Sequence, residues 1–518
     1  MSEPMTRRAL LCAGAGSMAA IAAATVRAPA AAAVTRAPSP VRELEARVRD
    51  GMAKYGIPGV AVGLFHHGTE YVRGFGVTDL DNPVPVDGDT VFRVASTTKT
   101  FTGTAVMRLV ERGLLDLGRP VRSYLPGFHS SDAAASARVT VREVLDHSAG
   151  WLGDFFLDTG TGDDALAQYV AAMSSLPQLT APGTVFAYNN AALAVAGRLI
   201  EVVTRVPYEQ AVQTLVTGPL GLAHSRYFLD DLPGASVAVP HVFDADGAVV
   251  AAPAAFAVPR SADAFGGLIS SARDQLRWAR FHLGDGRIPG GGGRLLTPRS
   301  MHMMQSHPGP GGTLFVELDG VGVTWLLRPT AEGPKVVQHG GDWTGEHSGF
   351  LMVPERGFAL TVLTNSDGGP GLLAELFADD WALEHFAGVH NLPAVPHTLP
   401  DAELAAYEGR YSAEQIGFDG SVGTIEFDVV AHAGQLSVQV DGTIGLLLPF
   451  YRKDYVLILD ATGADTFFRA NFVRGGDGTV AWLRYGGRLY RRGAPAAAAH
   501  AAGTRLPLTP GTLPHPAR

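Results

Sequence analysis

Residues 92–99 read Phe-Arg-Val-Ala-Ser-Thr-Thr-Lys, and a helical pattern of apolar residues begins near Ser96 and stops at Gly113. Positions i and i+3 share one face of a helix, so we expect the hydroxyl of Ser96 and the amine of Lys99 to meet. A serine hydroxyl becomes an effective nucleophile when an adjacent base takes its proton, and a lysine serves as that base where burial lowers its pKa. The pattern therefore favours an acylated Ser96. The alternative is a helix-capping serine beside a solvated lysine.

Lysine is rare in this chain, which makes each position informative. Of 41 basic residues, only four are lysine: Lys54, Lys99, Lys335 and Lys453. Arginine stays protonated in proteins, whereas a buried lysine can lose its proton. We therefore expect Lys99 to carry chemistry and the other three to lie on the surface.

Two further patterns follow along the chain. Tyr188-Asn189-Asn190 offers a phenol for proton relay and an amide that orients substrate, although Asn190 could instead cap the next helix. His339-Gly340-Gly341 stands directly after an expected strand, and its glycines would let a substrate lie close against the strand backbone. The His-x-Gly spacing recurs five more times in the chain, so it has little weight alone, and an exposed turn is the alternative.

In the first 390 residues, strand patterns come first and last and helical patterns fill the middle. Apolar or alternating runs predict strands over 60–65, 71–77, 321–327, 335–338, 348–353 and 358–363. Helices are expected over 139–147 and 191–203 and from a capped start within residues 270–274. This order predicts an α+β fold, in which an antiparallel sheet is flanked by helices and stands beside a helical lobe.

A different pattern begins after the proline-rich stretch 391–400, which we interpret as a linker. Short strands, several of them separated by Gly/Asp turns, are expected over 423–430, 435–440, 445–449, 455–459, 466–472 and 480–485. They predict a small all-β barrel domain over 401–494. The Ala/Pro-rich tail over 495–518 is expected to be disordered.

The N-terminus has the composition of a targeting segment. Arg7-Arg8 precedes an apolar, alanine-rich stretch, and Ala31-Ala32-Ala33 is a small-residue cleavage pattern. We interpret residues 1–33 as a twin-arginine-type signal peptide, followed by a linker over 34–40 and a first domain over 41–390. The protein is therefore expected to be exported, secreted or held in the cell envelope, without a stable membrane anchor.

Several independent segments together resemble the class C β-lactamase, DD-peptidase and esterase family of serine hydrolases, which are penicillin-binding-protein-like. The resemblance spans about residues 42–388 and is carried by residues 92–99, 144–150, 182–190, 266–272 and 339–365. Their order along one chain makes the match specific. The small β domain is similar to the lipocalin-like modules appended to such hydrolases.

The resemblance implies a role for each matched residue. Ser96 attacks the substrate carbonyl and Lys99 accepts its proton. Tyr188 relays protons to the leaving group and activates the deacylating water, while Asn190 holds Lys99 and the substrate amide. His339, the fourth catalytic residue, takes the family's third-motif position beside Tyr188. The backbone N–H groups of Ser96 and Asp342 are expected to form the oxyanion hole.

The third motif departs from the β-lactamase pattern. Those enzymes carry Lys-Thr-Gly at this position, where this chain has His339-Gly340-Gly341. Gly340 and Gly341 are expected to bind the substrate. A histidine is only partly charged near neutral pH, and a glycine adds no side-chain donor, so a substrate carboxylate loses its permanent anchor. A His-x-Gly motif is similar to that of DD-peptidases, D-aminopeptidases, amidases and esterases. D-Amino-acid-containing peptides, amides or esters are therefore the expected substrates.

The resulting prediction is an exported serine hydrolase that forms an acyl-enzyme. One alternative is a penicillin-binding-protein-type thioesterase or acyl transferase that cyclises peptides, against which the signal peptide argues. The others are a β-lactamase and a non-catalytic module that binds a wall fragment or a lipid. Deletion of residues 401–518 is expected to leave acylation intact. The alternative is that the barrel covers the active site and sets the size of the substrate.

Composition and charge indicate which classes of binding partner to expect. A formal net charge of −9 without a basic run disfavours nucleic acid, and the expected partner is a small-molecule or peptide substrate. The sequence contains no metal-binding motif and implies no cofactor. Its single cysteine, Cys12, lies in the predicted signal peptide, so no disulfide is expected in the mature protein.

Overall fold

The computed structural model describes residues 39–306 and 309–493. The predicted signal peptide and the predicted C-terminal tail lie outside these residues. Within the described part, none of the helices is both long and apolar enough to cross a membrane.

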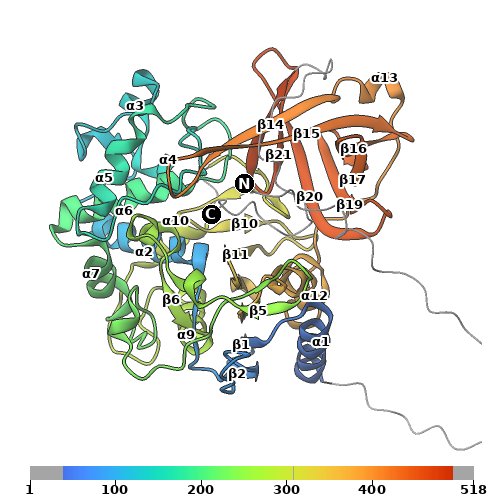
Figure 1. Ribbon diagram of the computed structural model, residues 1–518. Coiled ribbons are helices and arrows are strands. Elements are labelled where there is room, and N and C mark those ends of the chain that lie inside the picture. Colours follow the sequence, from blue (N-terminus) through green and yellow to red (C-terminus); the bar gives the residue numbers. More distant parts are fainter. Residues whose placement is uncertain (1–38, 307–308, 494–518) are drawn as a thin grey trace, which may run out of the picture.

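A central sheet of seven antiparallel strands forms the body of the first domain (Figure 1). Its spatial order is β2 (Thr69–Gly76), β1 (Gly59–His66), β13 (Phe358–Thr364), β12 (Glu346–Val353), β11 (Val336–Trp343), β10 (Leu326–Arg328) and β9 (Gly320–Val321). Strand β1 pairs with β13, and Val60 faces Thr364. The two ends of the domain's sequence therefore meet in the sheet, which confirms the predicted α+β class.

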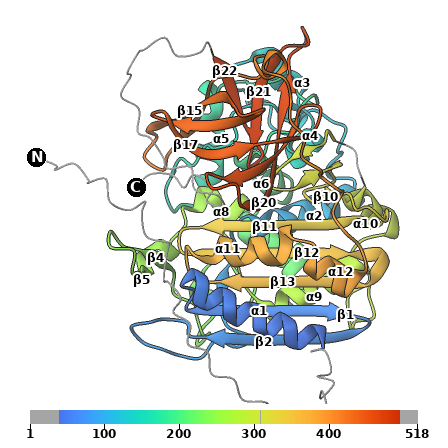
Figure 2. The same cartoon turned by 90° about the vertical axis from the view of Figure 1, so that its right-hand side faces the viewer.

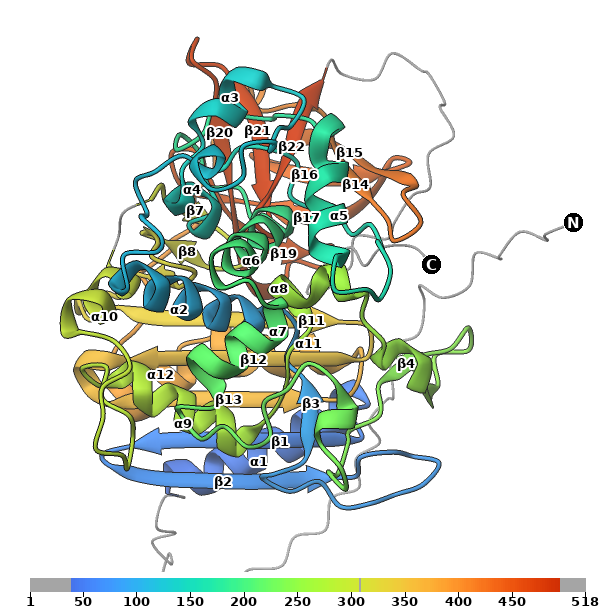
Figure 3. The ribbon, with the colours of Figure 1, turned by 90° about the vertical axis from the view of Figure 1, so that its left-hand side faces the viewer.

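Helices cover both faces of this sheet. On the face turned toward the viewer in Figure 2 lie α1 (Pro40–Tyr55), α11 (Gly369–Leu373) and α12 (Trp381–Ala387). On the opposite face lie α9 (Ala272–Leu283) and α2 (Thr98–Glu111), as Figure 3 shows. Helix α9 starts at a cap as predicted, because the side chain of Ser271 accepts a hydrogen bond from the N–H of Asp274.

The helical lobe adjoins α2 and is built around α6 (Asn190–Thr204), which is almost wholly buried. Asn189 caps α6, since its side chain accepts from the N–H of Ala192. The other helices are α3 (Ala133–Arg138), α4 (Val141–Leu145), α5 (Ala165–Ala172), α7 (Tyr208–Val212), α8 (Asp263–Gly266) and α10 (Pro298–Gln305). Short two-stranded pairs are β3 (Val91–Arg93) with β6 (Ile269–Ser271), β4 (His241–Phe243) with β5 (Val249–Ala251), and β7 (Gly312–Thr313) with β8 (Glu317–Leu318).

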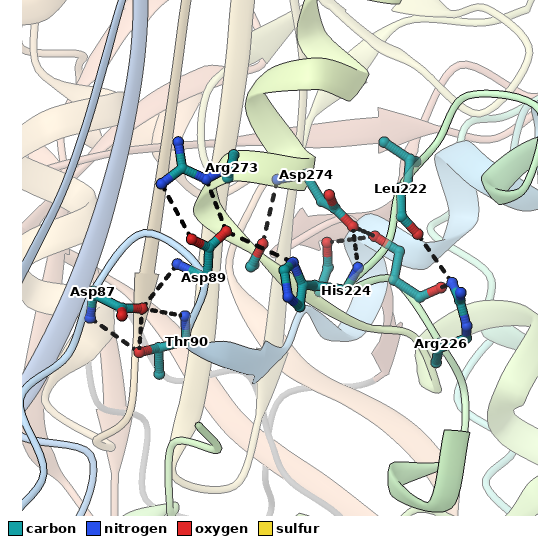
Figure 4. Close-up of polar contacts among 11 residues, drawn as sticks. Asp87, Asp89, Thr90, Leu222, His224, Arg226, Arg273 and Asp274 are labelled. Carbon is teal, nitrogen blue, oxygen red and sulfur yellow. Dashed lines mark hydrogen bonds and ion pairs between the residues drawn. The ribbon is translucent and has the colours of Figure 1, made fainter. Parts of the chain in front are cut away.

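A polar network lies beside the paired strands β3 and β6 (Figure 4). Strand β3 ends at Arg93, shortly before Ser96. Arg273 donates to Asp89 at 2.8 Å on the surface, where an ion pair contributes little. Asp274 is buried and accepts from the N–H of His224 and from the hydroxyl of Ser225, both at 2.8 Å. These buried bonds tie the 222–226 loop to the start of α9.

Two strand predictions need correction. The expected strand over 321–327 is divided into β9 and β10, because Thr324 has a φ of 63° and turns the chain between them. The third motif does not follow its strand but lies within it: β11 continues to Trp343, since His339 pairs with Phe350 of β12. Pairing with a neighbouring strand thus outweighs the weak strand propensity of two glycines.

The C-terminal domain is a closed, all-antiparallel barrel of eight strands, as predicted. Its strands are β14 (Gly409–Ile416), β15 (Val422–His432), β16 (Gln435–Val440), β17 (Thr443–Leu448), β19 (Tyr455–Asp460), β20 (Asp465–Arg474), β21 (Val480–Tyr485) and β22 (Arg488–Gly493), with β18 (Phe450–Arg452) beside β19 and α13 (Asp401–Leu404) before them. Pairing of β17 with β19 closes the ring. Its first and last strands, β14 and β22, had no predicted counterpart.

The barrel interior is a packed core. Eight apolar or aromatic side chains line a cavity of only about 10 Å³, roughly the space of a single water molecule: Phe427, Val438, Leu446, Leu448, Ile458, Ala470, Leu483 and Tyr485. This cavity has no room for a lipid chain, which argues against the lipid-binding alternative.

The stretch 391–400, predicted as a linker, is attached to both domains. Asn391 forms a β-bridge with Thr330, and the N–H of His397 donates to the carbonyl of Phe450 at 2.8 Å. The barrel is therefore held against the first domain at this end.

Candidate active site

Ser96 stands on a strained turn between β3 and α2. Ala95 has a φ of 45°, a left-handed conformation that is uncommon outside glycine, and Ser96 follows in the 3₁₀ turn η1 (Ala95–Thr97). The first N–H groups of a helix lack partners within it and point toward its N-terminus. The nucleophile predicted from sequence therefore sits where a backbone N–H can face a developing oxyanion.

Lys99 is placed as the prediction requires. Its Nζ lies 2.8 Å from Ser96 Oγ and 2.8 Å from the carbonyl of Phe265. Burial, together with the cation of Arg488, holds the pKa of Lys99 well below its usual value. Lys99 is 0% exposed, whereas Lys54 and Lys335 form ion pairs at the surface. The neutral amine that a base needs is thus favoured at this one lysine.

Tyr188 lies beside the pair, with its ring centroid 5.0 Å from Lys99 Nζ. Burial raises the pKa of the phenol above its ordinary value, and a hydrogen bond with Ser96 opposes this shift only in part. The phenol therefore stays protonated while the lysine tends to be neutral. Two neighbouring groups with pKa values pushed in these directions suit a base and an acid in one reaction.

His339 faces Tyr188 at a ring-centroid distance of 6.1 Å. Burial and the neighbouring Lys99 lower the pKa of His339 to about 3, so the ring is neutral across the physiological range. Its Nδ1 lies 2.7 Å from the carbonyl of Gly340, which assigns the proton to Nδ1 and leaves Nε2 as an acceptor. Nε2 is buried and has no hydrogen-bond partner among the described residues. At this position the site offers a neutral acceptor.

The two glycines of the third motif have different surroundings. A Cβ on Gly341 would lie 2.7 Å from the backbone nitrogen of Ser96. A glycine is therefore needed here to leave room for the turn that carries Ser96. A Cβ on Gly340 would meet only the carbonyl of Ser348, at 3.1 Å, and Gly340 is exposed. Strand β10 pairs with β11 only as far as Gln338, which leaves Gly340 as the place where a substrate backbone can lie along the strand.

Asp342 lines the same pocket as Ser96, and its carboxylate is held from behind. His347 Nδ1 lies 3.0 Å from Asp342 Oδ1, and its Nε2 lies 3.8 Å from Asp367. Although burial opposes it, these carboxylates raise the pKa of His347 to about 9. A charged His347 thus fixes the strand position from which the Asp342 N–H is predicted to face the oxyanion.

The role expected for Asn190 needs correction. Its Nδ2 donates to Asp154 at 3.0 Å, while the amine of Lys99 turns to the carbonyl of Phe265. A buried carboxylate is a strong acceptor and holds the Nδ2 donor of Asn190, and the amide oxygen of Asn190 makes no hydrogen bond with Lys99. Asn190 therefore contacts Asp154 and not Lys99, while its contact with a substrate amide stays a prediction.

Sequence reasoning gave no role to His147, which lies in one of the segments that carry the resemblance. Its ring stacks on Tyr188 at a centroid distance of 4.5 Å. Its Nδ1 accepts from the N–H of Asn189 at 3.0 Å, and its carbonyl accepts from the N–H of Ala187 at 2.9 Å. The backbone on both sides of Tyr188 is thus held by the helical lobe.

The barrel holds the same tyrosine from the other side. In the β21–β22 turn, the carbonyl of Gly487 accepts from the N–H of Tyr188 at 2.8 Å. Arg488 donates two hydrogen bonds to Asp154, at 2.9 and 3.0 Å, and its guanidinium lies 5.0 Å from the ring centroid of Tyr188. No motif marks this turn. It makes the barrel part of the site, so we no longer expect acylation to survive deletion of residues 401–518.

Comparisons with known proteins identify the family. Residues 44–383 match the family model described as Beta-lactamase. The chain is 34% identical over 363 residues to "Penicillin-binding protein 4" of Amycolatopsis lactamdurans, covering 69% of this chain and 94% of that protein. It is 24% identical over 487 residues to "Unguisins hydrolase ungD" of Aspergillus violaceofuscus, covering 83% of this chain and 85% of that protein.

Among solved structures, that of SurE with D-Leu is similar across both domains. The match has a TM-score of 0.68 and 25% identity, and it covers 88% of this chain and 99% of that one. The structure of SurE itself gives a TM-score of 0.67 and 26% identity with the same coverage. This chain therefore belongs to the β-lactamase family of penicillin-binding-protein-like serine hydrolases.

Proposed function

We propose that the protein is an exported serine hydrolase that acts on D-amino-acid-containing peptides, amides or esters through an acyl-enzyme on Ser96. The observation that carries this proposal is the 2.8 Å contact between Ser96 Oγ and a fully buried Lys99 amine. Similarity to a structure solved with D-Leu supports the D-amino-acid class, and similarity to a relative named a hydrolase supports hydrolysis.

The reaction follows from the placement of each group. Ser96 Oγ attacks the substrate carbonyl carbon while Lys99 accepts the hydroxyl proton, and the N–H groups of Ser96 and Asp342 receive the oxyanion. The bond to the leaving nitrogen or oxygen then breaks as Tyr188 donates its proton, which the tyrosine regains through Lys99. Water attacks the ester on Ser96, releases the acid and restores the hydroxyl.

The neutral His339 favours some members of the substrate class over others. A carboxypeptidase or β-lactamase substrate carries a carboxylate near the scissile bond, and a neutral imidazole supplies no cation for it. Aminopeptidase, amidase and esterase substrates have no such need. The Nε2 acceptor of His339 suits an N–H donor of these substrates.

The test is product release from paired substrates. D- and L-phenylalanine amides and methyl esters are incubated with the mature protein and with Ser96→Ala, and free phenylalanine is measured by chromatography. Release from the D forms by the wild type alone supports the proposal. Release by Ser96→Ala, or equal release from both enantiomers, contradicts it. Added glycinamide distinguishes the transferase alternative, because an acyl transferase forms the dipeptide amide in place of free acid.

Export is tested separately. A wild-type gene and an Arg7→Lys/Arg8→Lys variant are expressed in a twin-arginine-competent host. We expect the wild-type protein to appear outside the cytoplasm with an N-terminus near residue 34 and the variant to stay inside. Equal cytoplasmic retention of both would remove export from the proposal.

A further inference from the structure

A pocket extends from Ser96 into the space between the sheet, the α11 segment and the barrel. Its cavity volume is about 150 Å³, and an engineered apolar cavity of that size, roughly 150 Å³, binds benzene. Its lining includes Ser96, Tyr188 and His339. Much of the remaining lining is apolar, chiefly Leu314, Phe315, Val316, Phe350, Phe377 and Phe468.

Strand β12 supplies Phe350, and three further parts of the chain supply the other apolar side chains. The tip of the β7–β8 hairpin supplies residues 314–316, and strand β20 of the barrel supplies Phe468, whose ring lies 4.9 Å from that of Phe315. The N–H of Arg469 donates to the carbonyl of Phe315 at 2.7 Å, which joins hairpin and barrel. The third part is the π-helical turn η9 (Ala374–Ala378), a type of turn often found at functional sites.

The η9 wall is held rigidly. The buried guanidinium of Arg328 donates to the carbonyls of Phe377, at 2.5 Å, and Ala378, at 3.1 Å. The side chain of Asn391 donates to the same Ala378 carbonyl at 2.9 Å. The ring of Phe377 lies on Gly349 of β12, where a Cβ would come within 2.5 Å of it. The wall is therefore formed before any ligand binds.

The charged groups that reach the pocket are already engaged. Arg488 is paired with Asp154, and Asp342 is paired with His347. His339 is neutral. An apolar group entering the pocket meets aromatic and aliphatic surface, whereas a charged group would lose its hydration without gaining a dedicated partner.

We propose that this pocket is the acyl-side subsite and that it binds a bulky apolar side chain, of leucine or phenylalanine size, on the residue whose carbonyl Ser96 attacks. This rests on the proposed acyl-enzyme function and adds the side-chain class of its substrate. The barrel, through Phe468, sets part of this selectivity.

The experiment compares acyl groups on one leaving group. We expect the wild type to hydrolyse p-nitrophenyl 3-phenylpropanoate about 10- to 100-fold more efficiently, as kcat/KM, than p-nitrophenyl acetate. Phe377→Ala and Phe468→Ala should each lower this ratio severalfold, chiefly through a fall in kcat/KM for the phenylpropanoate ester. Phe467→Ala is the matched control, because Phe467 is the exposed neighbour of Phe468 on the same strand, and its ratio should be unchanged.

Phe377→Leu and Phe468→Leu control for misfolding of the alanine variants. They keep an apolar pocket wall and should retain most of the preference for the phenylpropanoate ester. Equal kcat/KM values for the two esters in the wild type would overturn the proposal, as would an unchanged ratio in both alanine variants. Neither result touches the acyl-enzyme function. That function fails separately if Ser96 reacts with no ester and with no fluorophosphonate probe.

Discussion

The helical lobe and the barrel hold Tyr188 from opposite sides, and they differ in how visible they are in the sequence. His147 of the lobe lies in a segment that resembles the family, and it holds the backbone at Ala187 and Asn189. Gly487 and Arg488 of the barrel carry no motif, yet Gly487 accepts from the N–H of Tyr188 and Arg488 donates to Asp154. The chemistry therefore resides in one domain, while its geometry depends on both.

The largest effect is expected within the first domain. Lys99→Arg should fold but lose acylation by about 10³- to 10⁴-fold, because a guanidinium cannot act as the base. The rate of labelling by a fluorophosphonate probe measures this directly. Near-normal labelling would show that Lys99 is not the base for Ser96, and would contradict the conclusion that the first domain carries the chemistry.

The barrel side is tested by Arg488→Ala. Loss of this guanidinium leaves Asp154 buried without its cation, and breaking a buried pair typically costs about 3–5 kcal/mol of stability. We expect a lower melting temperature and a roughly tenfold or greater fall in kcat as Tyr188 loses its support. Thermal melts and kcat on one substrate give both readouts.

Arg491→Ala is the control for that variant, since Arg491 lies exposed on the same strand and packs over Trp482. The double variant Arg488→Met/Asp154→Asn should recover stability but not kcat. Recovery of both would show that the barrel only stabilises the fold and does not position the tyrosine.

The lobe side is tested by His147→Ala, with a smaller expected effect. The stack on Tyr188 and the bond to the Asn189 N–H are lost, while the barrel contacts remain. We expect kcat to fall by about tenfold, with less change in stability than for Arg488→Ala. A larger loss than at Arg488 would reverse the comparison and make the lobe the dominant support.

The smallest effect is a pH dependence at His347. Its pKa is raised from 6.5 to about 9, so the stability it contributes is fully present below pH 6.5 and is lost as pH rises through about 9. Melting temperature and activity should both decline over this interval, and His347→Gln should flatten the decline. An unchanged alkaline profile in that variant would show that another group titrates.

Sequence patterns predicted the features that depend on residues close together in the chain. The meeting of Ser96 and Lys99 follows from one turn of helix, and the positions of most strands follow from alternation along short segments. Asn190 was misassigned because its partner, Asp154, is chosen by tertiary packing. Arg488 could not be found, since its partner lies 334 residues away and its strand, rich in arginine, hides the apolar alternation.

Intact-protein mass spectrometry tests the central claim most directly. The mature protein and Ser96→Ala are each mixed with a D-phenylalanine ester, benzylpenicillin and a fluorophosphonate probe. A mass increment from the ester and from the probe on the wild type alone is the predicted result, because only Ser96 carries the activated hydroxyl. An increment of equal size on Ser96→Ala, or none from any reagent on folded wild type, would contradict an acyl-enzyme at Ser96.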